Sequence, residues 1–497
     1  MKALKITEWI LAALEFVLGI VFLVSVGRLN MLPMKYFAVA VAFVLVVAAV
    51  TAFLTRFKAG GIISIVMSVL FIGVYGYSAY MVNHASNTLD KVTGIEVQEN
   101  TVAVFVKADS KISSAEDLTG KKIAVNTTFD KEHTDELVEN LQKKINSALN
   151  LKEYASPVET VDALLSGDVD AFVLNESYIS ILTDLEGYED IESRIKIVYE
   201  YRYTNKVVID EPSGVSNENQ QGGMGEAGYN TEYTTLDTSS FDPDAFVVYI
   251  SGSDTRSNIL DVSRSDVNIL AFVNPNKREV LLVNTPRDYF VPLPISDGVC
   301  DKLTHAGIYG VEVSMGALGM LYGITPKYYA QVNFVGFEKL IDALGGVSVY
   351  SEYAFSNYGV NVVEGYNTFN GSQALAFVRE RYQLPGGDRQ RGKNQMAVIQ
   401  AVIAKAASPA ILTNYTGIMN SMTGTFATNV STDFISSLVK KQLDEGGSWT
   451  VNTYAVDGTG MYSSCYSMPT SSVYVMVPNA DTVNAAIERI QAVMNKQ

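Results

Sequence analysis

Apolar residues are concentrated near the N-terminus of the chain, in three long runs. The runs cover Trp9–Gly27, Tyr36–Leu54 and Ala59–Val82, and Glu15 is the one charged residue inside them. Each run is close to the roughly 20 residues that cross a bilayer core. Because three runs follow one another without a small-residue cleavage site, a cleaved signal peptide is excluded. The pattern therefore predicts an anchor of three transmembrane helices within residues 1–85.

The basic residues around these runs give an expected orientation. If the N-terminus is cytoplasmic, the positive-inside rule accounts for the placement of Lys2, Lys5, Arg56 and Lys58. Arg28 and Lys35 then lie on the outer side, so the charge bias is small. Three spans in this orientation place everything after Val82 outside the cell.

Residues 90–210 alternate between short apolar runs and amphipathic stretches, which predicts a small α/β accessory domain. Strands are expected at Val102–Lys107, Lys121–Asn126 and Ala171–Leu174, with helices over Lys131–Leu149 and up to Gly167. The phrases "ISSAEDLTGKKIAVN" and "VETVDALLSGDVDAFVLNES" resemble one lobe of periplasmic solute-binding proteins. A complete binder of that type needs two lobes, so a spacer or docking domain is the other interpretation.

Residues 211–240 are rich in Gly, Ser, Asn, Gln and Thr, which predicts a linker, and a second domain is expected over 241–497. Its first strand is the apolar run Ala245–Ile250. Val267–Val273 and Glu279–Asn284 follow, joined by an Asn-Pro-Asn-Lys turn, and form a predicted hairpin.

The predicted hairpin places charged side chains at one edge of the sheet. Asp266 precedes its first strand and Arg287 follows its second, so antiparallel pairing places the two residues together. Asp254, after the neighbouring strand, is expected at the same edge, where α/β sheets commonly build sites. A structural salt bridge between Asp266 and Arg287 is the alternative.

A second set of charges lies between residues 379 and 391, which contain four arginines and no lysine. After the apolar run Ala374–Val378, we expect Arg379 and Arg381 to share one face of an extended strand. Arg391 and Gln395 are four residues apart at the start of an apolar helix, so they share a helix face. Arginine binds phosphate through two parallel hydrogen bonds and stays charged, which indicates an anion site.

The overall composition limits the choice of partners. The formal net charge is −16, which disfavours nucleic-acid binding and requires a local cluster for any anion site. The two cysteines, Cys300 and Cys465, either form one disulfide or remain free thiols.

Seven motifs occur in order over residues 244–408: "SGSDTR", "SRSD", "NTPRD", "DKLTHAGIYG", "VNFVGFEKLIDALGGV", "NGSQALAFVRERY" and "GGDRQRGKNQ". Together they resemble the LytR–CpsA–Psr family of bacterial cell-envelope proteins. The three-span anchor and the accessory domain are similar to the capsule-associated branch of that family.

The resemblance implies a three-layer α-β-α catalytic domain with a mixed central sheet, outside the membrane of a Gram-positive bacterium. It implies a Mg²⁺-dependent phosphotransferase that moves a glycopolymer, capsular or of teichoic type, from undecaprenyl pyrophosphate to peptidoglycan. Capsule-synthesis proteins are further expected partners.

Site residues carried over from the family pattern fall into three groups. Asp254 and Asp266 are expected to bind the metal. The residues expected to bind the pyrophosphate are Arg287, Arg379, Arg381, Arg391 and Gln395, with Asp388 orienting Arg391. Catalysis is assigned to Asp266, Arg287, Arg379 and Arg381.

Several points stay open from the sequence. The proton acceptor is either Asp254 or Asp266, and His305 is a weaker candidate whose alternative role is structural. The apolar stretches Ala306–Tyr322 and Phe334–Leu344 are candidates for a lipid slot. The same site also fits a pyrophosphate hydrolase, or a scaffold or regulator that binds a polyprenyl phosphate without turning it over.

Overall fold

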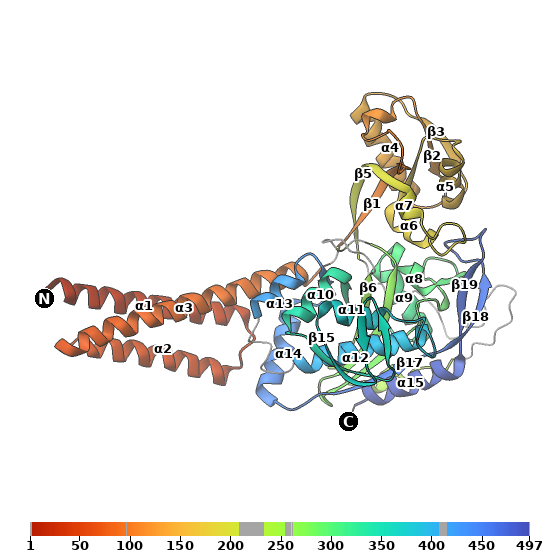
Figure 1. Ribbon diagram of the computed structural model, residues 1–497. Coiled ribbons are helices and arrows are strands. Elements are labelled where there is room, and N and C mark those ends of the chain that lie inside the picture. The colour runs from red at the N-terminus through yellow and green to blue at the C-terminus, as the bar shows by residue number, and fades with distance from the viewer. Residues whose placement is uncertain are drawn as a thin grey trace.

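The computed structural model describes residues 2–95, 97–207, 233–253, 260, 262–406 and 415–496. Three parts follow one another: a helical anchor, an accessory α/β domain and a larger α/β domain, called here the catalytic domain (Figure 1). The anchor projects from one side of the catalytic domain, and the accessory domain sits on another side of it (Figure 1).

The anchor consists of α1 (Lys2–Leu29), α2 (Met34–Leu54) and α3 (Lys58–Val92), which confirms the three predicted helices. All three are long and apolar enough to cross a membrane. At 1.5 Å per residue, the 35 residues of α3 exceed a hydrocarbon core of roughly 30 Å. The C-terminal turns of α3 therefore continue beyond the bilayer toward the catalytic domain.

Polar contacts at the two ends of the anchor show which end faces the catalytic domain. The Lys5 ammonium donates to the Thr55 carbonyl, which joins the N-terminal end of α1 to the α2–α3 loop. At the opposite end, Lys440 of the catalytic domain donates to Asn30 at 3.1 Å, and Lys35 pairs with Asp444 at 2.8 Å. The α1–α2 loop therefore lies on the side of the catalytic domain, and the N-terminus lies on the other side.

The accessory domain has a five-stranded mixed sheet in the order β3-β2-β4-β1-β5. β1 is antiparallel to both β4 and β5, whereas β2 is parallel to β3 and β4. The predicted strands and helices are all present, with small shifts at their ends. Its elements are β1 (Val97–Lys107), η1 (Glu116–Leu118), β2 (Lys122–Asn126), α4 (Lys131–Ile145), β3 (Asn150–Tyr154), α5 (Pro157–Ser166), β4 (Ala171–Asn175), α6 (Glu176–Leu182), α7 (Ile191–Arg194) and β5 (Ile195–Lys206).

The catalytic domain is built on a six-stranded sheet in the order β16-β11-β6-β7-β8-β17. The pairs β11–β6 and β8–β17 are parallel, and the pairs β16–β11, β6–β7 and β7–β8 are antiparallel, so the sheet is mixed as expected. The strands are β6 (Phe246–Ser253), β7 (Ser265–Asn274), β8 (Glu279–Asn284), β11 (Tyr328–Asn333), β16 (Phe426–Thr428) and β17 (Thr450–Ala455).

Helices cover both faces of this sheet, because its central strands are apolar on both sides. Along β7, Leu270 and Phe272 pack into one core with α9 and α15, whereas Ile269 and Ala271 pack into another with Met396 of α12. The three-layer architecture is therefore confirmed. The helical elements of the domain are η2 (Thr238–Ser240), α8 (Leu303–Ala306), η3 (Gly307–Tyr309), α9 (Val311–Tyr322), α10 (Phe334–Ala343), α11 (Gly371–Arg379), α12 (Asp388–Ala406), α13 (Tyr415–Met422), α14 (Thr432–Glu445) and α15 (Ala480–Met494).

Short two-stranded sheets complete the domain. They pair β9 with β10, β12 with β15, β13 with β14 and β18 with β19. Their bounds are β9 (Phe290–Pro292), β10 (Cys300–Lys302), β12 (Val347–Ser351), β13 (Phe355–Asn357), β14 (Val360–Val362), β15 (Gly365–Phe369), β18 (Gly458–Ser463) and β19 (Val473–Pro478).

The end of the predicted linker packs on the catalytic domain. The backbone N–H of Asp237 donates to the Gln491 side chain of α15 at 2.9 Å, and Leu236 is buried in the core beside that helix. Residues 208–232, which hold most of the predicted linker, lie outside the described residues.

The extended strand predicted around Ala374–Val378 is wrong, because these residues belong to α11. Asn370 and Gln373 form a capping box that begins the helix, and this local signal determines the structure of the apolar run that follows. A run of five apolar residues does not by itself distinguish a buried strand from a buried helix.

Cys300 and Cys465 are free, buried thiols, so the unpaired alternative holds. Burial raises the pKa of Cys300 to about 11, which makes its reactive thiolate scarce at neutral pH.

Candidate active site

The predicted contact between Asp266 and Arg287 is present at the edge of the central sheet. The β7–β8 register pairs Ile269 with Asn284, so the residues just beyond this pair meet. Arg287 Nη1 donates to Asp266 Oδ1 at 2.8 Å, and both side chains are largely buried. Burial opposes ionisation of Asp266, but Arg287, Arg391 and Arg264 hold its pKa below the ordinary range.

The N-terminal turn of α12 supplies a second arginine. Arg391 and Gln395 both lie on this helix, are both buried, and are one turn apart as predicted. Asp388, the first residue of the helix, forms an ion pair with Arg391 at 2.5 Å. Burial raises the pKa of Asp388, and Arg391 and Arg287 oppose that rise.

Arg379 and Arg381 are placed differently from each other. Arg379 ends α11, and its guanidinium lies over the rings of Phe334 (4.8 Å) and Tyr358 (5.1 Å). Arg381 follows the helix and donates to the Tyr382 hydroxyl at 2.6 Å, a neutral partner that leaves its charge for a ligand. Only Arg381 of the two lines the cavity described next.

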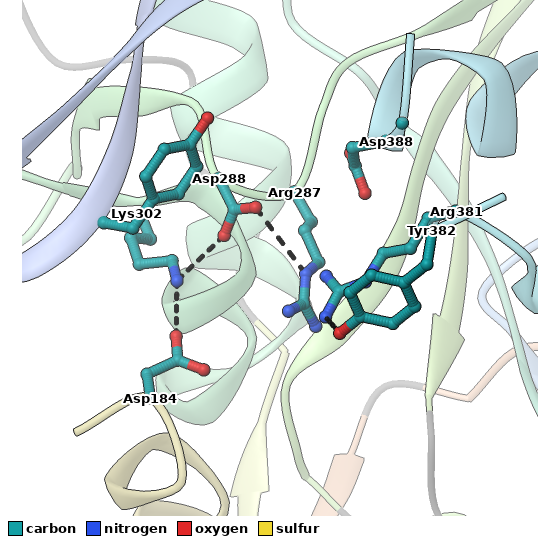
Figure 2. A pocket seen from close by; sticks show the side chains of 9 residues that line it. Asp184, Arg287, Asp288, Lys302, Arg381, Tyr382 and Asp388 are labelled. Atoms are coloured by element: carbon teal, nitrogen blue, oxygen red, sulfur yellow. Dashed lines mark hydrogen bonds and ion pairs between the residues drawn. The ribbon is translucent and has the colours of Figure 1, made fainter. Parts of the chain in front are cut away.

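A cavity of about 370 Å³ opens beside these residues. Figure 2 shows the Arg287 and Arg381 side chains extending into the same region, with Lys302 between two aspartates on the opposite wall. Nine residues line it: Asp184, Arg287, Asp288, Lys302, Arg381, Tyr382, Gly387, Asp388 and Tyr474. None comes from α9 or α10, and the predicted lipid slot along those helices stays a prediction.

The charged side chains form a continuous alternating series along the cavity wall. Lys302 Nζ pairs with Asp184 and, at 2.8 Å, with Asp288 Oδ1. Asp288 Oδ2 lies 3.8 Å from Arg287 Nε, and Arg287 in turn pairs with Asp266. The two aspartates raise the pKa of Lys302 despite its burial, so the ammonium stays charged.

Two arginine donors point to a ligand. Within the described part of the chain, the Nε atoms of Arg287 and Arg391 are buried and have no hydrogen-bond acceptor. Buried donors are rarely left unpaired, since each costs roughly 1–3 kcal/mol. Arg287 and Arg381 line the cavity, so an anion with several oxygens, such as a diphosphate, would accept hydrogen bonds from both guanidinium groups.

Several cavity residues were not predicted as site residues. Asp288 and Lys302 lie inside the quoted motifs "NTPRD" and "DKLTHAGIYG", which were the available signals. Asp184 belongs to the accessory domain, 118 residues before Lys302 in the chain, and no local pattern marks it. The predicted metal residue Asp254 lies outside the described residues, so its position relative to Asp266 stays a prediction.

His305 occupies a structural position below the cavity. Its ring is fully buried, with Nδ1 2.9 Å from Asp301 Oδ1 and Nε2 3.3 Å from Asp184 Oδ2. Burial opposes the charged ring, but Asp301 and the hydrogen bond to Asp184 outweigh burial and raise the pKa of His305. A buried ring between two carboxylates that favour its charged form is a poor proton acceptor, which supports the structural alternative.

Fold and site together define a membrane-anchored α/β protein with an arginine-lined cavity suited to a phosphorylated ligand. A family model for the LytR–CpsA–Psr family matches residues 214–483, more than half of the chain. The chain therefore belongs to the LytR–CpsA–Psr family. A model described as DNA polymerase processivity factor matches residues 58–174, which combine α3 with part of the accessory domain and cover too little to assign a family.

Curated relatives are similar to part of this chain, at equal levels of identity. Proteins named polyisoprenyl-teichoic acid–peptidoglycan teichoic acid transferase TagU from Oceanobacillus iheyensis, Bacillus anthracis and Enterococcus faecalis are each 33% identical. The alignments cover 44%, 40% and 38% of this chain. They span 68%, 64% and 62% of the relatives, so the latter two are matched over slightly less than two thirds of their length.

Solved structures of B. subtilis proteins also resemble about half of this chain. TagU is 25% identical, with 51% of this chain and 98% of that chain covered and a TM-score of 0.40. TagV is 21% identical, with 50% and 97% covered and a TM-score of 0.42.

His305 provides a pH-dependent prediction. Because its folded pKa lies above the ordinary 6.5, its contribution to stability is fully present below pH 6.5 and is lost as pH rises through the folded value. We expect the ring to titrate above 6.5 in NMR spectra of the detergent-solubilised chain. His84→Gln and His133→Gln assign the signal, since the chain has three histidines. A midpoint at or below 6.5 would contradict the assigned ion pairs.

Proposed function

We propose that this chain is a membrane-anchored phosphotransferase that moves a glycopolymer from an undecaprenyl pyrophosphate carrier to peptidoglycan. The observation that carries the proposal is the convergence of Arg287 and Arg381 on one cavity, with Arg391 placed next to it by its ion pair with the lining residue Asp388. Relatives named teichoic acid transferases, 33% identical over 224 and 198 residues, support it. The polymer is of capsular or teichoic type.

In the proposed reaction, a hydroxyl oxygen of peptidoglycan attacks the phosphorus atom that carries the polymer. A bond forms between that oxygen and the phosphorus, and the bond from the phosphorus to the bridging oxygen breaks. Undecaprenyl monophosphate leaves, and the hydroxyl proton passes to a carboxylate of the site. Such a transfer depends mainly on positioning and on stabilising negative charge.

The residues of the cavity divide this work. Arg287 and Arg381 line it and bind the phosphate oxygens, while Arg391, held by Asp388, adds charge from behind. Gln395 lies one turn further along α12. Arg379 lies over the rings of Phe334 and Tyr358 and does not line the cavity, and its role in catalysis stays a prediction.

Mg²⁺ is part of the proposal, and Asp266 fits it as one ligand. Its carboxylate is kept ionised by neighbouring arginines, and Mg²⁺ prefers carboxylate oxygens. Within the described residues no group of three or more potential metal-binding side chains occurs. The second proposed ligand is Asp254, which lies outside the described residues, and substrate oxygens complete the set. When bound, the ion supplies positive charge that polarises the phosphorus.

The proposed orientation places the catalytic domain outside the cell. Lys5 and Arg56 belong to the end of the anchor opposite that domain, where the positive-inside rule expects the cytoplasm. The carrier's diphosphate and the wall then lie on the same side as the cavity.

We expect Arg381→Ala to lower the rate of transfer on the order of 10²–10³-fold, because the mutation removes a positive charge that contacts the diphosphate. The fold should be unaffected, since Arg381 donates its hydrogen bond to the side chain of Tyr382, which is exposed. The measurement is transfer from a synthetic lipid-linked diphosphate to peptidoglycan by the full chain in detergent.

Arg389→Ala is the matched control, because Arg389 pairs with Asp457 at the surface. Equal transfer by the two variants would contradict the assignment. Free polymer phosphate as the product would favour a hydrolase, and bound lipid without any product would favour a scaffold.

Removal of divalent metal is expected to abolish transfer while the chain stays folded. Treatment with EDTA followed by added Mg²⁺ should restore activity, and circular dichroism before and after follows the fold. Full activity in EDTA would exclude a role for Mg²⁺ at Asp266.

Thiol labelling tests the orientation, because native Cys300 and Cys465 are buried and give little background. We expect Tyr366→Cys, exposed on the catalytic domain, to react in intact cells with a membrane-impermeant maleimide. Arg56→Cys, in the α2–α3 loop, should react only after permeabilisation. The reverse pattern would refute an external catalytic domain.

A further inference from the structure

One wall of the cavity comes from the accessory domain. Of its nine lining residues, Asp184 alone lies outside the catalytic domain, in the loop after α6. In Figure 2 this carboxylate points toward Lys302, on the side of that ammonium opposite Asp288. The accessory domain therefore contributes a charged side chain to the site.

Asp184 contacts three cationic side chains of the catalytic domain. Its Oδ2 accepts a hydrogen bond from Lys302 and lies 3.3 Å from His305 Nε2. Its Oδ1 accepts from Arg264 Nη1 at 3.4 Å. The side chains of Lys302, His305 and Arg264 are 4%, 0% and 10% exposed, so water does little to screen these pairs.

The domain that carries Asp184 is firmly packed. Tyr178 of α6 donates to the Ser467 carbonyl, and Phe129 meets Tyr309 edge-on with ring centroids 5.6 Å apart. The same hydrophobic cluster joins accessory residues such as Phe172 to catalytic residues such as Val475. Asp184 is thus held at a fixed place beside the cavity rather than on a loose tether.

Lys302 is the group whose position depends most on this contact. Its ammonium is held between Asp184 and Asp288, and Asp288 also lies beside Arg287. Without the Asp184 carboxylate, Lys302 would be free to move toward Asp288 and to compete with Arg287 for it. A change at Asp184 in the accessory domain would then alter the position of Arg287, which faces the diphosphate.

We propose that Asp184 is a positioning residue of the diphosphate site, through which the accessory domain fixes Lys302 beside Asp288 and Arg287. The inference rests on the proposed function and gives the accessory domain a direct part in it, in place of a spacer role. Asp184 is not a proton acceptor. Although burial favours its neutral form, His305, Lys302 and Arg264 hold its pKa well below the usual range.

The test is Asp184→Asn in the full chain, which removes the charge and nearly preserves the shape. We expect turnover in the transfer assay to fall at least about tenfold, because small misplacements of a positioned group are costly. The KM for the lipid-linked diphosphate should change less than about threefold, since the arginines remain. Asp184→Glu should recover part of the turnover.

Two control variants separate positioning from domain packing. Glu186→Gln removes an exposed carboxylate from the same loop, and Tyr178→Phe removes an interface hydrogen bond. Both should keep turnover within about twofold. Cys465 lies in the shared interface cluster, so its rate of alkylation reports separation of the domains.

Low turnover of Asp184→Asn with Cys465 protected as in the natural chain supports the proposal. Turnover equal to that of Glu186→Gln overturns it, and so does low turnover accompanied by rapid alkylation of Cys465, which indicates domain separation. If the natural chain transfers no polymer, the proposed function fails instead. Binding of farnesyl diphosphate then gives a separate readout: the affinity of Asp184→Asn for this probe should stay within about threefold of that of Glu186→Gln, and a larger loss overturns a positioning role.

Discussion

The structure of this site depends on a buried series of opposite charges that crosses a domain boundary. Asp184, Lys302, Asp288, Arg287 and Asp266 follow one another with each charge facing its opposite. Isolated charges at such burial would be prohibitively costly, and even paired charges are no guarantee of stability. What the series provides is position, because each group is held between neighbours on two sides.

That arrangement also explains how an acidic protein can hold an anion. The net charge of −16 is spread over the whole chain, whereas the cavity gathers guanidinium and ammonium groups whose acidic partners lie mainly along the walls. Arg381 donates to a hydroxyl, and the Nε atoms of Arg287 and Arg391 have no hydrogen-bond acceptor among the described residues. Local donors, and not the overall charge, determine what binds.

The sequence predicted those parts of the site that depend on local geometry. The hairpin register brought Asp266 to Arg287, and helical spacing placed Arg391 and Gln395 on one helix. The prediction of a strand around Ala374–Val378 was wrong, because a short apolar run has no period that distinguishes a strand from a helix. As a result, Arg379 does not share a face with Arg381 and lies over Phe334. The role of Asp184 could not be predicted from the sequence, because only the packing of the two domains brings its partners close to it.

The shared charge series has a consequence for how such proteins diversify. A module that is joined only by a tether can be exchanged between related chains as a cassette. Here the accessory domain presents an acid to three bases of its neighbour, Lys302, His305 and Arg264, so exchange of the module alone would strand cations in a dry interface. A recombination that keeps the site intact has to transfer Asp184 together with the three basic side chains that it contacts. The two domains are therefore expected to be inherited together.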